Sequence, residues 1–459
     1  MSHYTLRREI PIDEGYDLLV AGGGPAGVSA ATCAARLGAR VLLAEATGCL
    51  GGMGTSGLVN AFDPMADGER MLVGGFMREI VEKMHERGFL GPQVTPDYWL
   101  RRYHCWTPFR CEGLKLLLDE LAGDAGVEVR FFTRLIDADA DVGSKEVHGA
   151  VLHNVEGYRY VRAKAFVDAT GDAVLAALCG AECREAGRDT ERIMPGTLAS
   201  LHAGIDWGRC SGADQHRALE RAIEAGHFTQ VDRHLPGMSS VGETLGYLNG
   251  GHVFNLDALR CESLSNGMVL GRKIVQEYVE FYRKYVPGCE RIELVTTASL
   301  MGVRESRRIV GEYELNIDDY MARRQFADQI GLFNKFVDVH AYDTSLEEWE
   351  RLQREIREMR LGEGECFGIP YRILVPKGWR NLWVAGRCNS SDVLVHGSIR
   401  VMPAAAMMGQ AAGTAALQSI ETARPAFSID TEQLVATLRQ QGAYLPENGM
   451  PGPGAGTDG

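Results

Sequence analysis

The feature that most constrains this chain is a glycine turn set between two short apolar runs near its N-terminus. The first run spans residues 17–21 and is followed by GGGPAG and by small residues from Val28 to Leu37; after Gly38, ARVLLAE forms the second run. Short apolar runs beside glycine predict buried strands, and the small-residue stretch between them predicts a helix. This order of strand, turn, helix and strand is that of a βαβ unit, whose two strands are parallel.

The glycines of the turn have the spacing G-x-G-x-x-G, which is typical of dinucleotide binding. Gly22 would make the tight turn, Gly24 would let the backbone approach a pyrophosphate, and Gly27 would let helix and strand pack closely. Pro25 and Ala26 begin the helix, whose free N–H groups would face the phosphates. The alternative is a structural turn in a domain that binds no nucleotide.

Glu45 stands at the end of the second predicted strand, about 20 residues beyond the turn. A carboxylate at this place can accept hydrogen bonds from an adenosine ribose, so FAD or NAD is expected and NADP is not.

Composition limits the class of protein and its partners. The chain has 459 residues, of which 45% are hydrophobic and 24% are charged, as in ordinary globular proteins of more than one domain. A net charge of −13 argues against broad nucleic-acid binding. Eleven cysteines without a CxxC pair indicate free thiols in a reducing compartment.

The same sequence indicates a cytoplasmic location without a membrane segment. The N-terminus is polar and charged, unlike a signal peptide, and the most apolar stretches, 16–35 and 401–417, are interrupted by Gly, Pro or Gln. Homo-oligomer formation is left open.

Further strands and helices extend the α/β pattern beyond the first unit. Strands are expected at VEVRFF, EVHGAVLHN, YRYVRAKAFVDAT and LWVAG, and several of them alternate as in an antiparallel meander beside a parallel sheet. Helical periodicity marks residues 76–87, 113–122, 214–226, 265–286 and 345–360. The prediction is therefore an α/β fold with a mixed sheet.

Four motifs in order give the chain a family resemblance. They are GCLGGMGTSGLV (48–59), VDATGD (167–172), GVRESRRIVGEYEL (302–315) and NLWVAGRCNSSDVLVHGSIRVMPAAAMMGQAAGTAA (381–416). Together they resemble the FAD-dependent oxidoreductases related to the fumarate reductase and succinate dehydrogenase flavoproteins. The resemblance implies a Rossmann-like FAD-binding domain of the glutathione reductase type, with a discontinuous cap domain that binds substrate.

The resemblance also implies boundaries and cofactor contacts. The FAD-binding domain would span 16–195 and 366–420, a cap 196–365, and a flexible tail 445–459. The implied cofactor residues lie in the loop after the second strand, in the ATG turn and in the last motif: Gly51, Gly52, Thr55, Ala169, Thr170, Gly171, Gly386, Arg387 and Arg400.

The helix after Arg400 has small residues that would let it lie close to a flat ligand, with its N-terminus toward the flavin. The alternative is a close-packed core helix. Some relatives attach FAD through a histidine in the loop matching 48–57; none occurs here, so non-covalent FAD is expected.

A second glycine fingerprint for NAD(P)H is missing from any strand–helix context, so oxygen, a quinone or another protein is expected as the electron partner. Transient binding of a nicotinamide is the alternative.

Candidates for the substrate chemistry are few. Arg304 or Arg307 could hold a substrate carboxylate or polarise a carbonyl, since a guanidinium matches planar oxyanions; the alternative is an ion-paired strand face. His340 could act as acid or base, or could be structural. His396 is expected near the flavin ring. No spacing typical of a metal site occurs.

The sequence thus predicts an FAD-dependent dehydrogenase, oxidase or reductase that acts on a small polar metabolite. Three alternatives stay open: a flavin monooxygenase or halogenase, an NAD-binding protein resembling thiazole synthases, and a non-catalytic or tRNA-associated flavoprotein.

Overall fold

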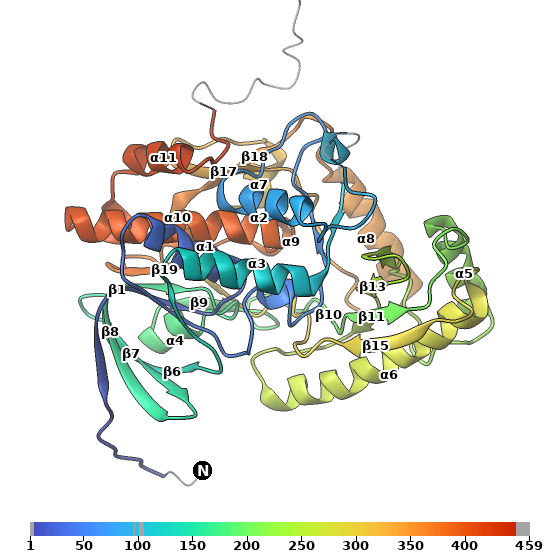
Figure 1. The fold of residues 1–459 in the computed structure, drawn as a ribbon, viewed down its shortest axis with the longest axis horizontal. Coiled ribbons are helices and arrows are strands. Elements are labelled where there is room, and N and C mark those ends of the chain that lie inside the picture. The colour runs from blue at the N-terminus through green and yellow to red at the C-terminus, as the bar shows by residue number, and fades with distance from the viewer. Residues whose placement is uncertain (1–3, 96, 101–104, 447–459) are drawn as a thin grey trace, which may run out of the picture.

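The computed structural model describes residues 4–95, 97–100 and 105–446 (Figure 1). Its first unit consists of β1 (Ile12–Ala21), α1 (Pro25–Arg36) and β2 (Val41–Ala44). The two strands are parallel and in register from Leu18 opposite Val41 to Ala21 opposite Ala44. The predicted βαβ unit is confirmed.

A seven-stranded mixed sheet grows from this unit. Its order is β5-β2-β1-β8-β7-β6, and β19 also pairs with β8. The pairs of β2 with β5 and of β8 with β1 and β19 are parallel, whereas β6, β7 and β8 form an antiparallel meander. The added strands are β5 (Glu128–Arg130), β6 (Arg134–Asp141), β7 (Glu146–Asn154), β8 (Gly157–Asp168) and β19 (Leu382–Val384). This is the predicted fold class.

Helix α10 (Met402–Thr422) lies along α1, beside which it is drawn in Figure 1. Their backbones are in contact, because a Cβ on Gly409 would stand 2.0 Å from the carbonyl oxygen of Ala26, and one on Gly413 would stand 2.2 Å from that of Ala30. Gly409 and Gly413 are thus explained by helix–helix packing, as the alternative of a close-packed helix has it, whereas the approach of the helix N-terminus to the flavin stays a prediction.

The middle of the chain forms a separate body of strands and helices, at the right of Figure 1. A four-stranded antiparallel sheet of order β12-β13-β11-β15 lies with α5 and α6 around its own buried cluster, which includes Leu219, Tyr278 and Phe281. The elements are β11 (Ser200–Ala203), α5 (Gly212–Glu224), β12 (Ser239–Ser240), β13 (Gly246–Leu248), α6 (Cys261–Tyr285) and β15 (Glu293–Thr297). The domain boundaries drawn from the sequence stay predictions.

The remaining elements include helices that pack on the first body, such as α2 (Gly75–Glu86) and α11 (Thr431–Gln440) against α10. The other helices are α3 (Cys111–Asp124), α4 (Val174–Cys179), α7 (Ile317–Met321), α8 (Leu346–Glu358) and α9 (Val393–Ile399), with short 3-10 turns at Gly52–Gly54, Tyr98–Leu100, Tyr371–Leu374 and Ala426–Ser428. The short strands are β3 (Ala61–Phe62), β4 (Thr107–Pro108), β9 (Cys183–Glu185), β10 (Gly196–Thr197), β14 (His252–Val253), β16 (Arg307–Ile309), β17 (Gln329–Phe333) and β18 (Phe367–Pro370). All five helices predicted by periodicity are present.

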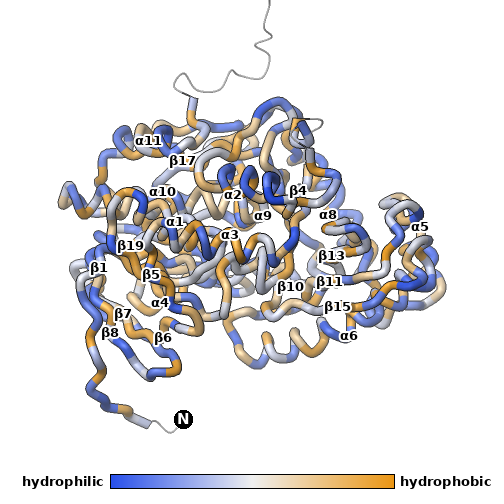
Figure 2. Tube along the Cα trace, viewed as in Figure 1, coloured by the Kyte–Doolittle hydropathy of each residue, from blue (hydrophilic) through white to orange (hydrophobic). Residues whose placement is uncertain are grey.

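Hydropathy follows this arrangement. Hydrophobic segments gather where the sheet meets α1, whereas the outer helix α5 is largely hydrophilic (Figure 2). Leu445, in the segment predicted to be a flexible tail, is buried, and its carbonyl accepts a hydrogen bond from Arg439 Nε at 2.6 Å. Residues 447–459 of that tail lie outside the described residues. Across the described ranges, no helix combines the length and the apolar character that crossing a membrane requires.

Candidate functional site

The glycine turn has the geometry that its spacing predicts. Gly22 has φ +95°, and a Cβ on it would stand 2.6 Å from the carbonyl oxygen of Ala169. A Cβ on Gly27 would stand only 1.7 Å from the carbonyl oxygen of Gly22. A Cβ on Gly24 would meet no atom within 4 Å. Gly22 and Gly27 are therefore required by close packing, whereas Gly24 borders open space in which a ligand can approach the backbone.

The N-terminus of α1 offers free donors to that space. Gly24 is its N-cap and makes no side-chain capping bond, unlike Ser211 and Ser345, which cap α5 and α8. The first intrahelical bond comes from Val28 N to Gly24 O at 3.0 Å, so the preceding N–H groups have no helical partner. Free N–H groups at a helix N-terminus bind phosphate.

Glu45 lies directly behind the turn. Its carboxylate accepts hydrogen bonds from Gly23 N and from Thr47 N, each at 2.6 Å, and the residue is only 7% exposed. A carboxylate has about four acceptor positions, so two remain for the hydroxyl groups of a ribose. Glu45 therefore both holds the turn and presents an acceptor beside it.

The predicted loop after β2 lies against the turn. Gly51 and Gly52 both have positive φ, at 101° and 50°, and Gly51 N donates to Gly23 O at 2.8 Å. A Cβ on Gly52 would stand 2.9 Å from Gly24 Cα. Thr55 is buried and donates its hydroxyl proton to a carbonyl of the same loop. The two glycine segments, 22–27 and 51–52, thus lie against each other beside the open space at Gly24. We call these segments and that space the glycine groove.

The ATG turn and the end of β19 complete this groove. Thr170 bonds to Asp168 through its N–H and its hydroxyl, at 3.0 and 2.7 Å, and Gly171 has φ +78°. Gly386 has φ +88°, and a Cβ on it would stand 3.2 Å from Ala26 Cβ. The strand end therefore reaches α1 because Gly386 has no side chain.

Arg387 ties the surrounding segments together. Its Nη2 lies 2.7 Å from Asp172 Oδ1, and its Nη1 donates to Val303 O at 2.8 Å. Asp172 directly precedes Ala173, the N-cap of α4. His396 is fully buried, and its Nε2 lies 2.7 Å from Arg387 O. Burial and the charge of Arg308 hold the pKa of His396 well below its usual range.

A second group of buried polar side chains contains three histidines, His234, His252 and His340, here called the histidine cluster. One ring nitrogen from each lies within 4.8 Å of those of the others. His252 Nε2 is 2.9 Å from His340 Nδ1, and the ring of His234 stacks on that of His252 at 5.1 Å. Asp232 and Asp338 stand at the two ends of the His252–His340 pair, at 3.2 and 3.5 Å.

Two buried arginines lie beside this cluster. Arg304 is 6% exposed, and its Nη1 donates to Pro195 O at 2.7 Å and to Thr197 Oγ1 at 2.9 Å. Within the part of the chain that the structure describes, Arg304 forms no ion pair. Arg400 donates from Nη2 to the backbone carbonyl of Asp338 at 2.8 Å. A buried guanidinium bound to neutral oxygens alone is prepared to receive an anion.

The ionisable groups in and beside the histidine cluster have strongly shifted pKa values. Burial and the neighbouring charge of Arg400 lower the pKa of Arg304 to about 9. Burial and the charge of His252 lower the pKa of His234 to about 3, and burial and Arg304 hold the pKa of His340 well below its usual range. Burial acts to raise the pKa of Asp232, but His252 outweighs it and the pKa falls to about 2. Such concentrated shifts favour binding or catalysis.

Asp338 is held ionised by several cations. Burial opposes this, yet Lys335, His340 and Arg400 bring its pKa well below its usual range. Lys335 Nζ lies 3.7 Å from Asp338 Oδ2 and also pairs with Asp63.

Arg307 is placed differently from Arg304. It lies on β16, where its Nε is 3.1 Å from Glu185 Oε1 on the adjacent β9. Its guanidinium thus has an anionic partner within the fold, which favours the ion-paired alternative, although its predicted role in substrate binding stays untested. Asp392, a further residue of the last motif, caps α9 through Val395 N at 2.8 Å.

Of the three histidines, sequence reasoning singled out only His340, whereas it named both arginines beside them, Arg304 for the substrate and Arg400 for the cofactor. Asp232, His234 and His252 fall within 196–365, the region that the family resemblance predicted to form a cap. Their spacing matches no short motif, because the three histidines come from separate segments of the chain.

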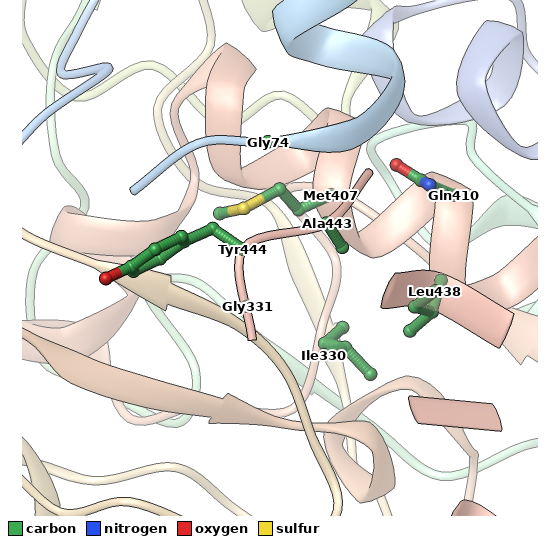
Figure 3. Close-up of a pocket in the computed structure, with 8 residues that line it drawn as sticks. All are labelled: Gly74, Ile330, Gly331, Met407, Gln410, Leu438, Ala443 and Tyr444. Carbon is green, nitrogen blue, oxygen red and sulfur yellow. The ribbon is translucent and has the colours of Figure 1, made fainter. Parts of the chain in front are cut away.

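Two hollows differ in size and place. One of about 10 Å³ between α10, α11 and β17 holds no more than a water molecule (Figure 3). It is lined by Gly74, Ile330, Gly331, Met407, Gln410, Leu438, Ala443 and Tyr444. The other, of about 430 Å³, begins at Val253, directly after His252, and extends over the first turns of α6. Its size suits a small molecule.

The fold and the groove define a dinucleotide-binding oxidoreductase of mixed α/β type. Residues 17–438 match the family described as FAD dependent oxidoreductase, and the chain belongs to that family. It is therefore an enzyme with FAD as its cofactor. The Gly24 space, the uncapped α1 and the free acceptor positions of Glu45 fit the adenosine diphosphate part of FAD. The narrower resemblance to fumarate reductase stays a prediction.

Solved structures of low similarity include several flavoenzymes. A geranylgeranyl bacteriochlorophyll reductase-like protein from Thermoplasma acidophilum is 14% identical, with a TM-score of 0.45 over 94% of this chain and 83% of that one. The flavin-dependent brominase Bmp2 is 13% identical, with a TM-score of 0.44 over 93% and 83%. The myxobacterial chondrochloren halogenase CndH is 15% identical, with a TM-score of 0.44 over 94% and 79%. No curated protein matches the chain significantly.

Proposed function

We propose that the enzyme transfers a hydride between non-covalently bound FAD and a small metabolite that bears a carboxylate or a carbonyl oxygen. The observation that carries the proposal is the buried guanidinium of Arg304, which contacts neutral oxygens only and lies beside Arg400 and the histidine cluster. When bound, FAD supplies the hydride chemistry. Non-covalent binding is supported by the lack of histidine in residues 48–57.

Arg304 would bind the anionic group of the substrate. Its hydrogen bonds to the protein come from Nη1 within the described residues, which leaves Nη2 and Nε to form a fork around two oxygens. Binding an anion there would also relieve the repulsion between Arg304 and Arg400. These two effects support a substrate with at least one negative or strongly polarised oxygen.

The histidine cluster would handle the substrate proton. His234 and His340 are neutral near neutral pH because burial lowers the pKa of each, so they can accept a proton from a substrate. Arg400, which bonds to the carbonyl of Asp338, would keep that segment in place beside the substrate. The electron acceptor, whether oxygen, a quinone or a protein, stays open.

The proposal is tested by mixing the FAD-loaded enzyme anaerobically with small 2-hydroxy acids, 2-amino acids and saturated dicarboxylates, and with uncharged alcohols and amines of the same size. Loss of the oxidised-flavin absorbance with a carboxylate is expected. For the reducing direction, the photoreduced enzyme is mixed with 2-oxo acids and unsaturated dicarboxylates, and return of that absorbance is expected.

The variant R304Q should raise the apparent KM for the reactive carboxylate by about 10- to 100-fold, because a charge-assisted hydrogen bond is lost. R272Q is the matched control, since Arg272 is exposed on α6, and it should behave as wild type. Wild-type kinetics of R304Q, or reaction only with uncharged compounds, would contradict the proposal. Product formation that needs both oxygen and an external reductant would support the monooxygenase or halogenase alternative instead.

A further inference from the structure

Two imidazoles lie between two carboxylates beside Arg304, the proposed substrate ligand. His252 Nδ1 is 3.2 Å from Asp232 Oδ2, His252 Nε2 is 2.9 Å from His340 Nδ1, and His340 Nε2 is 3.5 Å from Asp338 Oδ1. We call these four residues the proton array. The two rings thus stand between two carboxylates that lie within ion-pair distance, although His252 Nδ1 makes no hydrogen bond among the described residues.

The array has three gaps: one between Asp232 and His252, one between the two rings, and one between His340 and Asp338. When both imidazoles are neutral, two protons are present for these three gaps. Each gap separates two atoms that carry lone pairs, and a proton in the gap turns the repulsion between them into attraction. Two neutral imidazoles carry one N–H each. One gap is therefore always without a proton, either between the two rings or between a ring and a carboxylate. A third proton fills every gap, and its positive charge lies between two carboxylates.

Surrounding cations oppose the third proton. The titratable and charged groups that face the array are His234, Tyr278, Arg304, Lys335 and Arg400, with Asp63 paired to Lys335. Arg304 acts directly on His340 and, together with burial, keeps its pKa low. An anion bound to Arg304 would cancel this nearest repulsion, since the interaction of buried charges is only weakly screened.

We propose that binding of a carboxylate at Arg304 loads the array with one proton, and that the loaded array is the acid of the reaction. The inference rests on the proposed function and deepens it, because the substrate itself prepares the group that protonates it. When the substrate is reduced, it receives the hydride from the flavin and one proton from the array, which returns to its neutral form. When it is oxidised, the array accepts the proton released.

The geometry also explains the two ends of the array. Asp232 is buried, with a side chain only 8% exposed, and it is fixed by the backbone N–H groups of His234 and His252, both at 2.9 Å. Asp338 is 22% exposed and lies beside Arg400. Asp232 is therefore the fixed, buried end of the array and acts as a positioning residue. Asp338 is the more exposed end and lies toward Arg400.

The experiment uses the FAD-loaded enzyme and two probes, succinate and acetate, near neutral pH. Binding heats are measured by calorimetry in bis-Tris and in imidazole, two cationic buffers that differ in ionisation enthalpy. The difference between the two heats gives the number of protons taken up. We expect uptake of about one proton per bound carboxylate, with an affinity that rises about tenfold per unit of falling pH.

Variants separate the array from simple anion binding. H252Q, H340Q and D232N should bind the probes within about tenfold of wild type with little proton uptake, whereas H216Q, at an exposed histidine of α5, should retain the uptake. Because His252 is buried and its variant could fail to fold, the wild-type proton count decides the question alone.

The outcomes are distinct. Probe binding without proton uptake would overturn the array and leave the proposed function standing. Failure of both probes to bind would overturn the array, and it would overturn the proposed function as well if no acid of the panel reduced or reoxidised the flavin. One divalent metal ion per chain in the purified enzyme, lost in H252Q and H340Q, would also overturn the array, because these histidines would then be metal ligands.

Discussion

The glycine groove around Gly24 and the histidine cluster around His252 differ in what they are made of. The groove is formed by backbone, with Gly22, Gly27 and Gly52 so close to neighbouring atoms that a Cβ would collide. The cluster is formed by ionisable side chains. A site formed by backbone needs glycine at fixed spacing, and a single sequence shows that spacing. A site formed by side chains from distant segments needs no fixed spacing, so a single sequence does not show it.

The largest effects are expected when a methyl group is added at Gly27, which packing requires, and at Gly24, which borders the open space. G27A should lower the free energy of unfolding by about 3 kcal/mol, because its Cβ would stand 1.7 Å from Gly22 O and would push α1 away from β1. G24A should leave the stability of the FAD-free protein within about 0.5 kcal/mol, since its Cβ meets open space.

Urea unfolding of the FAD-free proteins and equilibrium dialysis of FAD measure both effects. G24A should weaken FAD binding at least about tenfold by occupying the space of the pyrophosphate. If G24A holds FAD as tightly as wild type, the cofactor does not pass over Gly24.

The next largest effect is expected at Glu45, whose side chain holds the backbone of the glycine turn. E45A deletes the acceptor of two backbone N–H bonds, and it should cost about 1–3 kcal/mol of stability as well as affinity for FAD. E45Q keeps the shape, and it should fall between E45A and wild type in FAD affinity. Unchanged flavin occupancy of E45A after purification would remove Glu45 from the cofactor site.

A buried histidine in the middle body should lower the stability of the protein in acid. His202, on β11, is fully buried, and burial lowers its pKa to about 4, below the ordinary value near 6.5. The unfolded chain therefore binds a proton that the folded chain does not, and the stability contributed above pH 6.5 is lost as the pH falls toward 4. H202Q should reduce the slope of the unfolding free energy by up to about 1.4 kcal/mol per pH unit over this window.

Denaturant unfolding between pH 4 and 6.5 gives this slope, with H216Q as the exposed control. Equal slopes for H202Q and wild type would show that His202 is protonated in the folded state.

The smallest effect is expected at Arg307, which tests the boundary of the substrate site. R307A removes a partly exposed ion pair with Glu185 and should cost less than about 1 kcal/mol, with no change in the kinetics of the reactive carboxylate. A rise in KM comparable to that of R304Q would place Arg307 among the substrate ligands.

The parts of the fold that sequence predicted are those governed by local rules. The βαβ unit, strand β7 and helix α6 follow from short apolar runs and helical periodicity. Strands β11, β13 and β15 were not predicted, because each is short and shows no regular alternation of apolar and polar residues. Their pairing depends on contacts with each other and with α6, which the sequence does not show. Helix α11 was also missed, in a segment that the family motifs do not reach.

The site divides in the same way. Glycine spacing and Glu45 predicted the groove, and the structure places these residues together. For Arg304 and Arg307, three positions apart, nothing in the sequence distinguished the buried residue from the ion-paired one. That distinction comes from β9, which brings Glu185 to Arg307, and from Pro195 and Thr197, which surround Arg304 with neutral oxygens.

The measurement that tests the central claim most directly is a crystal structure of the FAD-loaded enzyme soaked with succinate. The account predicts the pyrophosphate over Gly24 and the N-terminus of α1, and the carboxylate on Arg304 between the flavin ring and His340. A flavin ring that ends away from Arg304, with the histidine cluster outside its reach, would contradict the account.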